Sequence, residues 1–142
     1  MKRVDNMITI DTNVIVRYLA KDDLLQAQQA THLLTSQDCM ILQTVLLEAV
    51  WVLSSKAGLN WVREAVVERI RHILCLPTIW VQEPETVSLA LNWYESGMDF
   101  ADALHLANSV GDFATFDRRM SNKAEVLKTP NKVLLLADEV KQ

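Results

Sequence analysis

The sequence contains few of the residues that interrupt regular structure or cross-link small proteins. Of its 142 residues, three are glycine, three are proline and two are cysteine. With so little glycine and proline, long irregular loops are not expected. The two cysteines, Cys39 and Cys75, lie in apolar stretches and have no metal-ligand spacing. We therefore expect two reduced thiols in the core, without a disulfide or a cysteine-bound metal.

The sequence also lacks long hydrophobic runs and an excess of positive charge. No apolar run approaches the about 20 residues that span a bilayer, and the apolar stretch after Asn6 is too short for a signal-peptide core. Cytoplasmic residence without membrane contact is therefore expected. Fourteen Lys and Arg against 18 Asp and Glu give a net charge of −4. This balance argues against binding nucleic acid by bulk electrostatics, although metal ions held by acids can supply local positive charge.

The remaining composition is that of one folded domain. Half of the residues are hydrophobic and 23% are charged, which is enough apolar material for a core. We expect a single domain over residues 1–142. Short apolar segments alternate with segments of helical periodicity, which predicts an α/β sandwich with a central parallel sheet flanked by helices. The expected strands are 7–10, 39–43, 79–82, 113–116 and 133–136, and the expected helices are 24–34, 44–56, 60–74, 84–96 and 99–110.

Five acids stand out because they adjoin or interrupt apolar segments. They are Asp11, Glu48, Asp99, Asp102 and Asp117. The two helices that carry Glu48 and Asp102 are apolar on nearly every face, so we expect both helices to be buried. An unpaired buried carboxylate costs several kcal/mol, and the same segments contain no Lys or Arg. A bound divalent cation would partner these acids.

The expected positions of the five acids agree with this interpretation. Asp11 and Asp117 follow predicted strands, and sites in open α/β sheets form outside the carboxyl ends of strands. Asp99 and Asp102 share a helix face, and Glu48 lies about one turn into the helix after the second strand. Oxygen ligands without His or Cys favour Mg²⁺, with Mn²⁺ as a substitute. Such acidic metal sites are used for phosphodiester hydrolysis.

Simpler roles exist for individual acids. Asp99 and Asp11 also fit helix or turn caps, and Asp117 fits a polar turn. Glu48 and Asp102 are harder to explain in this way. His105, three residues after Asp102, is expected to pack its helix and not to serve the site.

Two other functions remain open at this point. A magnesium-dependent phosphatase or phospho-acceptor domain would use Asp11 as a nucleophile and would need a positioned lysine. The lysines nearest the acidic segments, Lys21 and Lys56, lie outside the apolar stretches. A non-catalytic partner-binding domain that kept the fold is the other alternative, and the intact acidic set argues against it.

Taken together, four segments in order resemble the motifs of the PIN-domain ribonuclease family, especially its VapC-type toxins. The similarity extends over nearly the whole chain. The segments are Ile10–Arg17, Glu48–Leu53, Asp99–His105 and Ala114–Arg119.

The resemblance implies roles for individual residues. Asp11 and Asp102 would be the first candidates for direct metal ligands. Glu48 and Asp117 would complete the acidic pocket, and Asp99 would be an accessory acid. Thr12, Asn13 and Thr115 would support the pocket or orient water. The basic residues beside the motifs, which are candidates for RNA phosphate contacts, are Arg17, Arg118 and Arg119.

The resemblance also implies an activity and partners. It implies a magnesium-dependent endoribonuclease that acts on structured RNA, forms a homodimer, and is the toxin of a pair with a small cognate antitoxin similar to VapB. The segment 60–72 has apolar residues, including Val66 and Ile70, alongside arginines. It would accept an amphipathic antitoxin helix.

Overall fold

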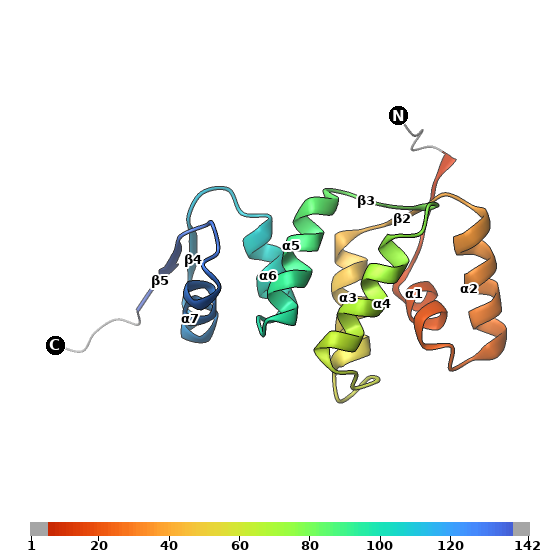
Figure 1. Cartoon of the computed structure of the whole chain (residues 1–142), viewed down its shortest axis with the longest axis horizontal. Coiled ribbons are helices and arrows are strands. Elements are labelled where there is room, and N and C mark those ends of the chain that lie inside the picture. Colours follow the sequence, from red (N-terminus) through yellow and green to blue (C-terminus); the bar gives the residue numbers. More distant parts are fainter. Residues whose placement is uncertain (1–5, 138–142) are drawn as a thin grey trace. The chain divides into compact units, whose positions relative to one another are not determined.

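The computed structural model describes residues 6–137 and divides the chain into two compact units. The first unit reaches to Glu83, and the second begins at Pro84 with helix α5, Pro84–Glu95 (Figure 1). Every strand pair in the described residues is parallel, and the first unit's sheet is flanked by helices. The predicted α/β class with a parallel sheet is confirmed. The expectation of a single domain over residues 1–142 stays a prediction.

The first unit contains a three-stranded parallel sheet in the order β1-β2-β3. Pairing between Ile8 and Cys39 and between Cys39 and Ile79 sets its register. The helices bury residues such as Ile15, Leu46 and Ile70 completely. The elements are β1 (Ile8–Thr9), α1 (Thr12–Ala20), α2 (Leu24–Ser36), β2 (Cys39–Ile41), α3 (Gln43–Ser54), α4 (Arg63–Leu74) and β3 (Ile79–Val81).

The second unit contains a two-stranded parallel sheet, β4-β5, in which Phe113 pairs with Val133. Its first two helices pack against each other and bury Val87, Leu91 and Leu106. Pro84 begins the first of these helices, as predicted, because a proline at this position loses no intrahelical hydrogen bond. The elements are α5 (Pro84–Glu95), α6 (Phe100–Ala107), β4 (Phe113–Thr115), α7 (Arg118–Leu127) and β5 (Val133–Leu135).

Two helices were not predicted from the sequence. The residues after Asp11 form α1, although this segment is rich in β-branched residues that favour strands. Burial of Ile15, Val16 and Leu19 on one face outweighs that local preference. The polar turn expected after Asp117 is instead the start of α7, a mostly polar helix that buries only Met120 and Ala124.

The predicted start of α4 was also wrong. The helix was expected over residues 60–74, but it begins at Arg63 with Val62 as its cap. Asn60 instead adopts a left-handed conformation (φ 57°), which asparagine tolerates well. Its N–H donates to the Ser55 carbonyl in the turn after α3, where Gly58 is also needed. A Cβ at Gly58 would lie 1.9 Å from the carbonyl oxygen of Val52.

The expectation of fully buried helices and cysteines was wrong in part. In α3, Glu48 is exposed and Trp51 is 60% exposed, so this helix has a solvent-facing side. His105 on α6 is likewise exposed and does not pack the helix. Cys39 is buried as predicted, whereas Cys75 lies exposed at the end of α4. Hydrophobic composition alone does not show which side of a helix packs.

Val66 and Ile70 are buried within the first unit, so they are not available to an antitoxin helix, whereas Val62 is 65% exposed. Among residues 6–137, no helix combines the length and the hydrophobicity that crossing a bilayer requires.

Candidate acidic active site

Three of the five predicted acids lie around one cavity in the second unit. Asp99 is the cap that precedes α6, Asp102 lies in the first turn of α6, and Asp117 precedes α7. The cavity has a volume of about 460 Å³ and is lined by Gly97, Met98, Asp99, Asp102, Asp117, Arg119, Met120 and Lys123. The structure therefore brings Asp99, Asp102 and Asp117 together around this cavity.

Asp99 and Asp117 also cap helices. A cap was the simpler role considered for Asp99, whereas Asp117 was expected in a polar turn. The Asp99 carboxylate accepts a hydrogen bond from the Asp102 N–H at 3.2 Å, and the Asp117 carboxylate accepts one from Met120 at 3.1 Å. The Asp117 N–H donates to Thr115 Oγ1 at 3.0 Å, so Thr115 supports this acid. Each carboxylate has about four lone-pair positions, so one capping bond leaves room for a cation.

Asp102 is electrostatically strained in this cavity. Partial burial raises its pKa, and the negative charges of Asp99 and Asp117 raise it further. His105, one turn further along α6, acts in the opposite direction. Close carboxylates without a counter-charge disfavour ionisation, and a bound cation would reverse this effect.

The first unit holds the other two acids. Asp11 caps α1, because its carboxylate accepts from the Thr12 N–H at 2.7 Å. The Thr12 hydroxyl, which is only 7% exposed, donates to Glu48 Oε1 at 3.1 Å. Thr12 thus links Asp11, which caps α1, to Glu48 in α3, and its hydroxyl holds the Glu48 carboxylate in position.

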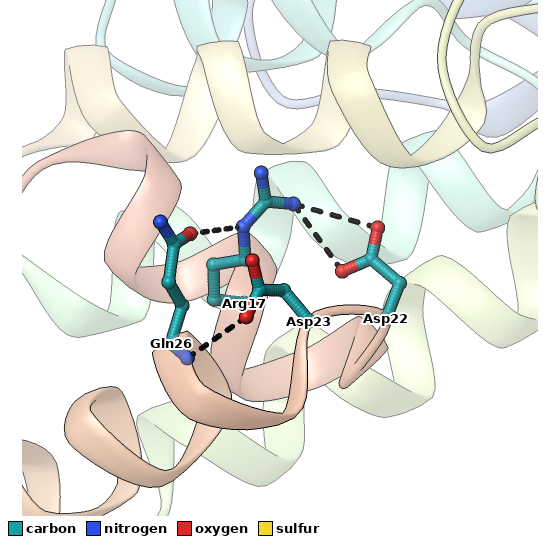
Figure 2. Close-up of polar contacts among 4 residues, drawn as sticks. All are labelled: Arg17, Asp22, Asp23 and Gln26. Carbon is teal, nitrogen blue, oxygen red and sulfur yellow. Dashed lines mark hydrogen bonds and ion pairs between the residues drawn. The ribbon is translucent and has the colours of Figure 1, made fainter.

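Arg17, one of the predicted phosphate contacts, already has protein partners. Figure 2 shows its guanidinium with Nε donating to Gln26 at 2.6 Å and Nη1 lying 3.2 Å from Asp22 Oδ1. Arg17 and Asn13 line a separate cavity between α1 and α2. The structure therefore gives Arg17 a local structural role and places Asn13 beside it. Arg118 and Arg119, the other two candidates, are exposed at the start of α7, and Arg119 lines the acidic cavity.

Comparison with known families decides the classification. The family described as PIN domain matches residues 8–126, a span that contains all five acids. The chain belongs to the PIN domain family. No curated protein matched the chain. PIN domains are typically nucleases that depend on divalent metal ions, and the phosphatase alternative receives no support from this match.

The donor set of this PIN domain fits a divalent cation. The cavity of the second unit offers three carboxylates, which are hard oxygen ligands. Within residues 6–137, no three His, Cys, Asp or Glu side chains are close enough together to enclose an ion directly. Mg²⁺ usually keeps several waters and takes only one or two carboxylates, so a loose arrangement of acids is compatible with it.

The strain on Asp102 predicts how the metal-free PIN domain responds to pH. The pKa of Asp102 is higher in the folded state than in the unfolded state, so near this pKa the folded state binds more protons. The contribution of Asp102 to the free energy of unfolding therefore falls as the pH rises above the ordinary Asp pKa. We expect Asp102→Asn to raise the Tm in EDTA at pH 7 by about 1–3 °C, a small effect because solvent screens the partly exposed carboxylate. The gain should vanish near pH 3, where wild-type Asp102 is protonated.

Thermal unfolding followed by circular dichroism from pH 3 to pH 8 measures this effect. Asp112→Asn, an exposed acid of the same unit outside the cavity lining, is the matched control. If Asp102→Asn had a lower Tm than the wild type in EDTA at pH 7, the prediction that the ionised Asp102 destabilises the metal-free fold would be wrong.

Sequence reasoning missed one residue that lines the acidic cavity, Lys123, and one that acts on an acid of the cavity, His105. Lys123 lies four residues after Arg119, so both cations project from one face of α7, but the helix itself was not predicted. His105 was assigned to packing, although it acts on the Asp102 carboxylate. Its spacing of three from Asp102 was the available signal.

Proposed function

We propose that this chain is a magnesium-dependent endoribonuclease that hydrolyses RNA phosphodiester bonds. The observation that carries the proposal is the cavity that Asp99, Asp102 and Asp117 line together, in a chain of a nuclease family. The acids of both units serve one activity, and residues 1–142 act as one nuclease domain. The family match, which continues across the boundary between Glu83 and Pro84, supports this assignment.

The proposed metal ligands are Asp11, Glu48, Asp102 and Asp117, with Asp99 as an accessory acid. Bound Mg²⁺, or Mn²⁺ in its place, supplies positive charge and lowers the pKa of a coordinated water. The protein's part is to hold the acids in position. Thr12 fixes Glu48, Thr115 fixes the backbone of Asp117, and the capping bonds fix the side chains of Asp99 and Asp117.

The substrate contacts and partners of this proposal come from the family resemblance. Arg118 and Arg119 contact RNA phosphates, and Asn13 orients water or a neighbouring side chain. Arg17 is a weaker candidate, because Asp22 and Gln26 already bind its guanidinium. The chain is proposed to be a cytoplasmic homodimer and the toxin of a toxin–antitoxin pair, inhibited by a small VapB-like antitoxin.

A cleavage assay on total cellular RNA tests the nuclease activity. We expect defined fragments with Mg²⁺ or Mn²⁺, and a loss of cleavage in EDTA that added Mg²⁺ restores. Mapping the fragment ends identifies the cleavage point. The same cleavage in EDTA as in Mg²⁺ would contradict a metal-dependent activity, and intact RNA in all conditions would contradict a nuclease.

A further inference from the structure

The acidic cavity of the second unit contains a lysine that neither the motifs nor the family match assigns a role. Lys123 lines this cavity together with Asp99, Asp102 and Asp117. It is half-buried on α7, one turn after Arg119. A lysine among carboxylates either neutralises them or binds an anionic ligand next to them.

The geometry of Lys123 does not favour neutralisation. Its Nζ donates to the backbone carbonyl of Ser96 at 3.3 Å, and within residues 6–137 it makes no ion pair with a carboxylate. The charges that act on the pKa of Asp102 are those of Asp99, Asp117 and His105. Lys123 therefore lines the cavity, and within residues 6–137 it forms no ion pair with the three acids.

Gly97 makes this position of Lys123 possible. A Cβ at Gly97 would lie 2.9 Å from Lys123 Nζ and 3.3 Å from its Cε, and Gly97 also has a φ of 114° that other residues rarely adopt. The lysine side chain thus lies along bare backbone just before α6. Its ammonium group has three donors, and Ser96 takes one of them.

The charges around the cavity suggest what the remaining donors bind. Three carboxylates against two cations, Arg119 and Lys123, leave the lining at −1, and a divalent cation brings it to +1. Such a lining attracts a phosphodiester, and the two cations are spaced one turn apart on α7. We propose that Lys123 is a substrate-binding residue that holds an RNA backbone phosphate beside the acids. This inference rests on the proposed ribonuclease function.

Steady-state kinetics in Mg²⁺ tests the proposal with an RNA fragment that contains the mapped cleavage point. Lys123→Met should raise KM by about three- to tenfold and change kcat by less than about twofold, and Lys123→Arg should restore most of the loss. Lys132→Met is the matched control, since it removes the same charge from the same unit outside the cavity lining.

Binding of the same RNA in Mg²⁺ is measured by fluorescence anisotropy on chains that also carry Asp11→Asn, which suppresses cleavage and leaves the cavity lining unchanged. The slope of log Kd against log salt should fall by about 0.7 in Lys123→Met and by less in Lys132→Met. Equal effects of the two substitutions on KM and on the slope would overturn the proposal. So would a lower Tm of Lys123→Met with an unchanged KM, because Lys123 would then only attach α7 to Ser96. A wild-type chain that cleaves no RNA would instead refute the ribonuclease function itself.

Discussion

Asp11→Asn and Asp102→Asn are each expected to reduce Mg²⁺-dependent RNA cleavage by at least about a hundredfold. A catalytic metal contributes several kcal/mol of transition-state stabilisation, and each 1.36 kcal/mol changes the rate tenfold. Replacing a carboxylate with an amide removes a charged ligand at nearly constant shape. Asp102 lies in the acidic cavity of the second unit and Asp11 starts α1 in the first, so the two variants test both halves of the proposed ligand set.

The controls for this prediction separate lost chemistry from lost folding. Glu68→Gln and Asp112→Asn each remove an exposed acid, one from each unit, and should cleave RNA at the wild-type rate. Far-UV circular dichroism should give the same spectrum for all variants. Wild-type activity in both Asp11→Asn and Asp102→Asn would refute the assignment of the acids. Loss in only one would confine the ligand set to the unit that carries it.

Expression of the wild-type chain alone in a bacterial host is expected to arrest growth, as proposed for a toxin. Arrest should require the acids, so Asp11→Asn at the same protein level should allow normal growth. Co-expression with the small neighbouring reading frame, the expected antitoxin, should restore growth with the wild-type chain. An antitoxin that places a basic side chain among the carboxylates would inhibit by replacing the charge of the metal.

Glu68→Gln is again the matched control and should arrest growth as the wild type does. Colony counts after induction, together with protein levels on a gel, provide the measurement. Normal growth with abundant wild-type protein that cleaves RNA in vitro would refute the toxin role and leave the nuclease role intact.

Local features of the sequence predicted a good part of this fold. Pro84 begins α5, and the side chain of Asp99 caps α6, because such contacts join residues at most three apart. The parallel strand pairing followed from strands alternating with helices. Where local preference and tertiary packing disagreed, as in α1, the sequence pattern predicted the wrong element or none.

The candidate site was predictable only in its acids. Asp11, Glu48, Asp99, Asp102 and Asp117 are conspicuous in the sequence because they adjoin apolar segments. The cations beside them are not conspicuous, since surface lysines and arginines are common. Arg17 follows the first motif but binds Asp22 and Gln26, whereas Lys123 lies 27 residues from its hydrogen-bond partner Ser96 and still reaches the acidic cavity.

The sequence by itself determined the alternation of strands with helices, the family and the positions of the five acids beside apolar segments. Those properties depend on residue type and on spacing within one or two helical turns. Only the tertiary structure decided that Glu48 is exposed and linked to Thr12, and that Gly97 leaves space for Lys123. It also decided that burial and the charges of Asp99 and Asp117 raise the pKa of Asp102. The packing of separate helices and loops sets side-chain exposure, most distances between charges and the close approaches of the backbone. That packing depends on many contacts between distant segments, so no short segment encodes it.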